Sequence, residues 1–299
     1  MFARRHPLLF SMLVMCGIGA VVIISVAALL FLGKSDSTLK FGDKVGVIEV
    51  NGLIADPKPV LTQLKELRKN EDVKAIVLRI NSPGGGVGPS QEIYTEVRKT
   101  KLVKKIVVSM GAVAASGGYY IASPADHIMA SPGSITGSIG VIMEFANLED
   151  LFKKIGVSAF VIKSGEYKDV GSPVREMTAK EKAMLQGFID DVHRQFVRAV
   201  AEAREMSEEQ VQAIADGRIL TGEQAKELGL LDSLGNMEDA IALAAKLGGI
   251  EGEPTVFYAK KKEFSLLEYL LGSYTLTEVL DQITMGGRHC GYLWLPGRV

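Results

Sequence analysis

Hydrophobic residues change their spacing several times along this chain, and the first change is a run of 26 residues without a charge, 8–33. About 20 apolar residues cross a bilayer core, whereas the apolar part of a cleaved signal peptide has roughly 7 to 15. We therefore expect 1–33 to form a cytoplasmic stub and one transmembrane anchor. Arg4 and Arg5 precede the run and few basic residues follow it, which places the N-terminus in the cytoplasm and the rest outside the inner membrane.

Beyond a polar linker, 34–43, apolar runs alternate with segments of helical spacing. Strands are predicted at KVGVIEVNG (44–52), VKAIVLRIN (73–81) and KIVVSM (105–110), with helices in PVLTQLKELRKN (59–70) and PSQEIYTEVRKT (89–100). The pattern continues with HIMAS, SIGVIM and AFVIKSG as short strands. Continuous apolar strands that alternate with helices are typical of βαβ units in a parallel sheet. The sequence thus predicts an α/β domain over 44–250.

From Thr178 onward the spacing becomes that of helices. Thr178 is followed three residues later by Glu181, a capping box at the start of a long packing helix. Two shorter helices, each opened by a Ser or Thr cap, flank GRILTG, and a last helix runs from about 237 to 247. The tail, 251–299, is apolar but interrupted by Gly272. It either docks on a neighbouring subunit or is mobile and exposed, and trimming by the protein itself is a further possibility.

Composition and charge exclude several classes of protein. The formal net charge of -1 gives no electrostatic footprint for nucleic acid, so no nucleic-acid partner is expected. The two cysteines form no disulfide framework, because Cys16 lies in the apolar span and Cys290 in the tail. A lipoprotein cleavage box at Cys16 would require a small residue before the cysteine. Met15 is not small, so lipidation at Cys16 is not favoured.

Three glycines, Gly84 to Gly86, follow a predicted buried strand and precede a helix. Backbone N–H groups at a helix start form an anion-binding geometry. The run lacks the Gly-Lys-Ser/Thr ending of a phosphate loop and the spacing of the dinucleotide fingerprint, and we expect no cofactor and no metal. Two interpretations remain for the glycines, a tight turn or an oxyanion hole that stabilises a tetrahedral intermediate.

Ser116 stands among alanine and glycine in SMGAVAASGGYYIASPAD. Small residues either let a helix approach a sheet or leave room for a substrate backbone around a nucleophile. The motif loosely resembles a nucleophile elbow, but seven residues separate Ser116 from Ser109, near the predicted strand end, so the α/β-hydrolase topology fits poorly. None of the four histidines has a convincing partner. A lysine of lowered pKa can serve as the base instead, and Lys168 lies in a glycine-rich loop.

Taken together these segments resemble the signal peptide peptidase A family, membrane-anchored serine proteases with a Ser/Lys dyad. The matching stretches are RINSPGGGV, SMGAVAASGGYYIASPADHIMASPGSITGSIGV, SGEYKDVGSPVREMT and ADGRILTGEQAKELGLLD. The resemblance implies a fold like that of caseinolytic protease and crotonase, with repeated ββα units. It also implies that Ser116 is the nucleophile, Lys168 the general base and Ser138 the residue that orients the lysine. The backbone N–H groups of Gly85 and Gly117 would form the oxyanion hole.

The same resemblance implies ring-shaped homo-oligomers whose dyad is completed across protomers. The expected function is a membrane-anchored serine endopeptidase, in contact with membrane lipid, that degrades remnant signal peptides after secretion. Three alternatives stay open: a protease of this type that acts on one membrane-protein partner, a non-catalytic membrane scaffold, and a crotonase-type acyl-CoA enzyme. The subsite preference and the ring size do not follow from the sequence.

Overall fold

The computed structural model describes residues 15, 17–21, 25, 42–259 and 291–293. The chain divides into two units, 1–42 and 43–299, and the account below concerns the second unit. None of the helices within the described ranges is long and apolar enough to cross a membrane. Most of the expected span, 8–33, lies outside the described residues, so the anchor stays a prediction.

The second unit is built on a mostly parallel sheet in the strand order β7-β6-β4-β2-β1-β9. Its centre consists of β1 (Lys44–Asn51), β2 (Val73–Ser82) and β4 (Lys105–Ala114), which pair in parallel. β9 (Thr255–Tyr258) extends one edge, and β5 (His127–Ala130) joins β4 to β8 (Ser233–Leu234). β6 (Ile135–Gly137) and β7 (Ile219–Thr221) form an antiparallel pair. The strands predicted at 44–52, 73–81, 105–110 and 127–131 are therefore confirmed.

Helices cover both faces of this sheet, which explains why its central strands are apolar at consecutive positions. α3 (Lys58–Lys69), α4 (Val87–Lys101), α5 (Gly117–Ala122) and α7 (Ala179–Arg204) contribute to the larger core, with Ile76, Leu78 and Ile80 of β2. α10 (Met237–Leu247) packs on the opposite face, against Ala75 and Val77. Because side chains alternate along a strand, β2 sends hydrophobic groups to both cores.

The predicted helix starts are also confirmed. Thr178 accepts the N–H of Glu181, and the Glu181 carboxylate accepts the N–H of Thr178, so both halves of the capping box are present. Ser207 and Thr221 cap α8 (Glu208–Gln212) and α9 (Gly222–Glu227) in the same way. Each reciprocal cap satisfies N–H groups that have no partner inside the helix.

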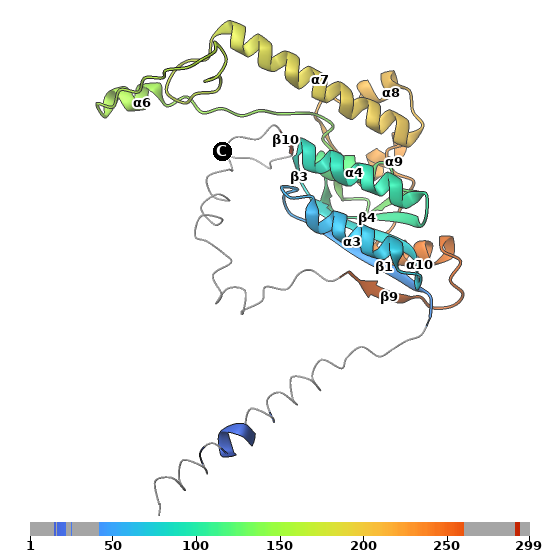
Figure 1. Ribbon diagram of the computed structural model, residues 1–299. Coiled ribbons are helices and arrows are strands. Elements are labelled where there is room, and N and C mark those ends of the chain that lie inside the picture. The colour runs from blue at the N-terminus through green and yellow to red at the C-terminus, as the bar shows by residue number, and fades with distance from the viewer. Residues whose placement is uncertain (1–14, 16, 22–24, 26–41, 260–290, 294–299) are drawn as a thin grey trace, which may run out of the picture. The chain divides into compact units, whose positions relative to one another are not determined.

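One segment, 140–178, leaves the body of the unit, and we call it the arm. Figure 1 shows it in green to yellow, with α6 (Glu149–Lys154) far from the sheet. The strand predicted at 159–165 is wrong, because these residues have no regular structure, and the one predicted at 138–143 is replaced by β6 just before it. A strand needs a neighbour to bond with. Phe160 and Ile162 in the arm are 87% and 93% exposed.

Candidate active site

Ser116 lies between a strand and a helix, in a backbone conformation that is rare for serine. β4 ends at Ala114 and α5 begins at Gly117, and Ser116 has φ 54° and ψ -116°. The strand thus continues four residues beyond Met110, the predicted end, and brings Ser116 into a sharp strand-to-helix turn. The sequence placed the strand end seven residues before Ser116, which argued against an elbow-like geometry. The longer strand ends two residues before Ser116, so that argument is wrong. Strain of this kind persists where the surroundings enforce it, as they do at active sites.

The surroundings of Ser116 bind its backbone and leave its hydroxyl free. The Ser116 N–H donates to the carbonyl of Gly137 at 2.8 Å, and the Ser116 carbonyl accepts the N–H of Tyr120 at 2.8 Å. Ser116 is only 1% exposed, yet its Oγ has no hydrogen-bond partner within the described ranges. A buried hydroxyl without a partner lowers stability. The fold therefore accepts that cost at this serine.

Two backbone N–H groups flank this serine. Gly117 is the first residue of α5, so its N–H has no helical carbonyl to bond. β3 (Gly84–Gly86) binds Ile54 through the Gly84 carbonyl and the Gly86 N–H, both at 2.9 Å. Because successive N–H groups of a strand point to opposite sides, the Gly85 N–H faces away from Ile54.

The end of β2 brings the Gly85 and Gly117 N–H groups to the same side of the molecule as Ser116. The Ala115 N–H donates to the carbonyl of Ser82 at 3.1 Å, so the chain that leads to β3 runs beside Ser116. A Cβ atom at Gly118 would lie 2.8 Å from the same carbonyl oxygen. Glycine at 118 is therefore needed for the close approach of the chain segments, which supports the packing interpretation there. Tyr119 and Tyr120 are buried behind the serine, as packing residues would be.

The free edge of β3 accepts an antiparallel strand. β10 (Gly291–Leu293) from the C-terminal tail pairs with it in the register Gly291↔Gly86, Tyr292↔Gly85 and Leu293↔Gly84 (Figure 1). Part of the tail thus docks on this edge, and residues 260–290 and 294–299 lie outside the described residues. The Gly85 N–H belongs to the side of β3 on which an extended peptide backbone lies.

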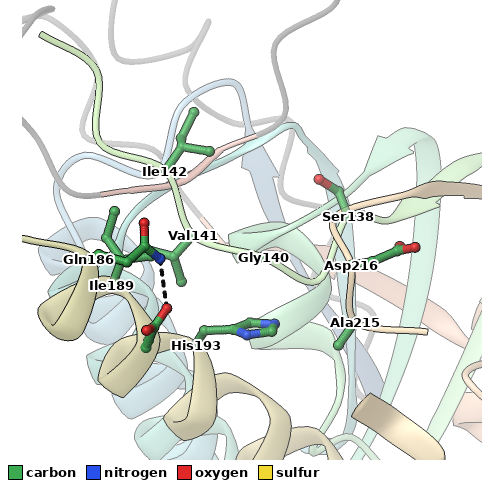
Figure 2. A pocket seen from close by; sticks show the side chains of 11 residues that line it. Ser138, Gly140, Val141, Ile142, Gln186, Ile189, His193, Ala215 and Asp216 are labelled. Atoms are coloured by element: carbon green, nitrogen blue, oxygen red, sulfur yellow. Dashed lines mark hydrogen bonds between the residues drawn. The ribbon is translucent and has the colours of Figure 1, made fainter. Parts of the chain in front are cut away.

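Ser138 is close to Ser116 through the backbone. It follows Gly137, whose carbonyl accepts the Ser116 N–H, and its own N–H donates to the Arg218 carbonyl at 2.7 Å. Ser138 also has a positive φ, 50°. It lies on the wall of a cavity of about 420 Å³ between α7 and the β6–β7 pair (Figure 2). The other lining residues are Gly140, Val141, Ile142, Gln186, Ile189, Asp190, His193, Ala215, Asp216 and Gly217.

His193 enters the cavity from α7, as Figure 2 shows. Its Nε2 is buried and has no hydrogen-bond partner among the residues that the structure describes. Asp190, one turn earlier on the helix, accepts the side-chain amide of Gln186 at 2.7 Å instead. Within the part of the chain that the structure describes, no Ser/His/Asp arrangement forms with Ser116, because its Oγ has no hydrogen-bond partner there.

Lys168 is the one predicted site residue that does not join the others. It lies on the arm between α6 and α7, and its side chain is exposed. Since the Ser116 Oγ lacks any hydrogen-bond partner within the described part of the chain, Lys168 does not hydrogen-bond to it. The chain thus brings Ser116, Gly117, Gly85 and Ser138 together and leaves the lysine apart.

The charged residues around Lys168 form a cluster of ion pairs. Arg175 donates to the carboxylates of Asp169 and Glu181, both at 2.9 Å. The bonds from Arg175, and then the Thr178 N–H, lower the pKa of Glu181 to about 2. Arg175, and then Lys163, hold the pKa of Asp169 well below its usual range. Opposite charges six residues apart in a loop that ends in a capping box are the signal that sequence reasoning could have used.

Comparison with known proteins identifies the chain's relatives. The family model described as Peptidase family S49 matches residues 98–251, and the one described as Clp protease matches 47–134. A Synechocystis protein provisionally named a protease is 50% identical over 210 residues, 70% of this chain and 76% of the relative. Protease 4 of Salmonella typhi is 37% identical over 253 residues, 81% of this chain but 39% of that protein. An Enterococcus faecium protein provisionally named signal peptide peptidase SppA is 39% identical over 224 residues, 69% of this chain and 65% of the relative.

Proposed function

The chain belongs to peptidase family S49, with a Clp protease-like fold, and from this premise we propose that it is a Ser/Lys endopeptidase. Ser116 is the nucleophile, and Lys168 of a second copy is the general base. The observation that carries the proposal is the state of Ser116, which is strained and buried, and whose hydroxyl has no hydrogen-bond partner among the described residues. It lies beside the first N–H of α5 and the strand edge of Gly85. A packing serine would have no reason to be in that state.

The reaction follows from these positions. The neutral amine of Lys168 takes the hydroxyl proton as Ser116 Oγ attacks the peptide carbonyl carbon, which forms a tetrahedral oxyanion. The N–H groups of Gly85 and Gly117 donate to that oxyanion. The C–N bond then breaks, and the lysine ammonium returns the proton to the leaving amine. Water attacks the acyl-serine in the second half, with the same lysine as base.

A second copy is invoked because one chain leaves the site incomplete. Lys168 lies on the arm, whose apolar side chains Phe160 and Ile162 are exposed. Large exposed apolar groups close together are typical of a protein interface. In a ring of copies the arm of one chain would lie over the body of the next, with Ser138 donating to or accepting from the incoming amine. The Clp-like fold supports such an assembly.

The substrate proposed is an extended peptide that adds to β3. β10 already pairs there as an antiparallel strand, so backbone bonds at this edge can bind a peptide with little regard to its side chains. Remnant signal peptides are the proposed source. The uncharged run 8–33 and the name of the Enterococcus faecium relative support that choice. The proposal includes a membrane anchor in 8–33 and a catalytic domain outside the cytoplasm.

The test compares purified Ser116→Ala, Lys168→Ala and wild-type protein on a quenched fluorescent signal peptide in detergent micelles. Both variants should lose cleavage while their far-UV circular dichroism and oligomeric state stay unchanged. Lys182→Ala is the matched control, since Lys182 is an exposed lysine of α7. A serine-directed fluorophosphonate should label wild-type protein, and excess peptide should compete with it. Retained turnover in Lys168→Ala would contradict the dyad.

A further inference from the structure

We propose that Arg175 is the positioning residue for Lys168: its guanidinium binds the loop that carries the lysine to the first turn of α7. This inference rests on the proposed function, because it concerns the base of the same dyad. It adds a residue that acts through Lys168 and does not itself touch substrate.

The C-terminal side of the lysine is bound by Arg175. The guanidinium donates to both carboxylate oxygens of Asp169 at 2.9 Å, and to the Asp169 carbonyl at 3.3 Å. It also donates to Glu181 at 2.9 Å. Glu181 is 3% exposed and accepts the Thr178 N–H at 2.8 Å. One planar fork thus joins the residue next to Lys168 to a buried carboxylate of the helix.

The N-terminal side of the lysine is bound by Lys180, from the same helical turn. Its ammonium donates to both carboxylate oxygens of Glu166, at 2.9 and 3.1 Å, and lies 5.7 Å from the centre of the Tyr167 ring. Lys163 donates to the Glu166 carbonyl at 2.9 Å and also binds the Asp169 carboxylate. Residues 166, 167 and 169 are therefore each bound, in a stretch that forms no helix or strand.

Lys168 itself stands between these bound neighbours with an exposed side chain. Its backbone N–H donates to the Gly165 carbonyl at 3.2 Å, and its ammonium has no bonded partner within the part of the chain that the structure describes. The carboxylate of Asp169 is already bound to Arg175 and Lys163, so it is not free to bind Lys168. The cluster binds the neighbours of Lys168 and leaves its amine available to a neighbouring active site.

Loss of the fork has two expected effects on catalysis. Arg175→Gln should lower kcat about 10- to 100-fold, because displacement of a catalytic group by about 1 Å costs up to that much. KM should stay within about twofold, since Arg175 is not on the β3 edge. In addition, loss of the guanidinium leaves Asp169 Oδ2 without its partner while Lys163 still binds Oδ1, so Oδ2 can bind the lysine ammonium and favour its protonated form. Because the proposed base acts as the neutral amine, kcat should rise with pH in the wild type, and in this variant the rise should move to higher pH.

The second effect separates a positioning role from a merely structural one. In the double variant Arg175→Gln/Asp169→Asn the competing carboxylate is absent, so the pH profile should return to that of wild type while the maximal kcat stays low. The matched control is Arg204→Gln. Arg204 binds the Asp232 carboxylate at 2.7 Å at the other end of α7, so its loss should lower the Tm without changing kcat or the pH profile.

Each outcome has one meaning. Wild-type kcat and pH profile in Arg175→Gln, with Lys168→Ala inactive, overturn the inference and leave the dyad intact. Equal losses of kcat and Tm in Arg175→Gln and Arg204→Gln overturn it as well, because a general loss of folding then explains both. Full turnover in Lys168→Ala contradicts the proposed function itself. Lowered kcat with a shifted profile that Asp169→Asn restores supports the inference.

Discussion

Gly85→Ala is the substitution for which the structure predicts the most severe steric overlap with backbone atoms near the site. A Cβ atom at Gly85 would lie 2.2 Å from the carbonyl oxygen of Ile54, and 2.6 Å from both its carbonyl carbon and its nitrogen. All three are backbone atoms, so no side-chain rotation relieves the overlap. The bridge between Ile54 and β3 has to open, and β3 has to move away from its present line.

The consequence for catalysis can be estimated from the proposed part of the Gly85 N–H. Removal of one oxyanion donor costs about 10²- to 10³-fold in kcat, or roughly 2.7–4 kcal/mol of transition-state stabilisation. A shift of β3 displaces this donor and the edge that binds the peptide, so KM should rise as well. We expect kcat/KM to fall by at least about 10²-fold.

Gly88→Ala is the matched control, three residues away. No atom lies within 4 Å of a Cβ at Gly88, which is in the first turn of α4. Alanine in place of glycine in a helix stabilises by about 0.5–1 kcal/mol, so this variant should keep wild-type kcat and have a slightly higher Tm. The assay is steady-state cleavage of the quenched peptide by variants of equal far-UV circular dichroism and equal oligomeric state. A Gly85→Ala protein that retains kcat within threefold of Gly88→Ala would refute the reasoning.

Three further predictions concern stability and assembly. Ser116→Gly should be more stable than Ser116→Ala by about 1 kcal/mol, a Tm difference of about 2–4 °C, since only glycine adopts φ 54° without strain; equal melting temperatures by calorimetry would contradict this. Ile162→Glu, at a 93% exposed position, should leave the circular dichroism unchanged but abolish oligomers and activity, as light scattering with chromatography can check. Glu181 has its pKa lowered from 4.5 to about 2 by Arg175, so its ion pair stabilises the folded chain fully above about pH 4.5 and loses this effect as the pH falls toward 2. Hydrogen-exchange protection over 163–181, corrected for the intrinsic pH dependence of amide exchange, should fall as the pH is lowered through that window, and protection that stays constant would count against it.

The sheet could be predicted from the sequence because its strands are buried on both faces. β1, β2 and β4 have nearly continuous apolar runs, which only a two-sided core explains, and the caps at Thr178, Ser207 and Thr221 mark their helices by local hydrogen bonds. Both signals are local in the chain.

The errors arise where structure depends on distant contacts. The run 159–165 has the composition of a strand, but a strand also needs a partner, and one chain supplies none among the described residues. β4 continues past Met110 because its last residues pair with Ser82 and Ile135, which the residues 111–114 alone do not reveal. That extension changes the geometry at Ser116 from a helix-start serine to a strained turn.

The candidate site divides in the same way. Ser116, Gly117, Gly85 and Ser138 are brought together by the ends of β2, β4 and β6 within one chain. Lys168 could be chosen from the resemblance, but in the proposed assembly its position relative to Ser116 depends on contacts between copies, which one sequence does not reveal. Arg175 was not predicted, since its partners lie six residues away on both sides and only the fold of the arm brings them together.

The central claim, a dyad shared between two copies, is tested most directly by mixing Ser116→Ala with Lys168→Ala. Each variant alone should be inactive. Unfolded together and refolded as mixed assemblies at equal amounts, they should recover about one quarter of wild-type activity, because one site in four then joins an intact serine of one copy to an intact lysine of its neighbour across a head-to-tail interface. Mixed assemblies that form but remain inactive would contradict the account.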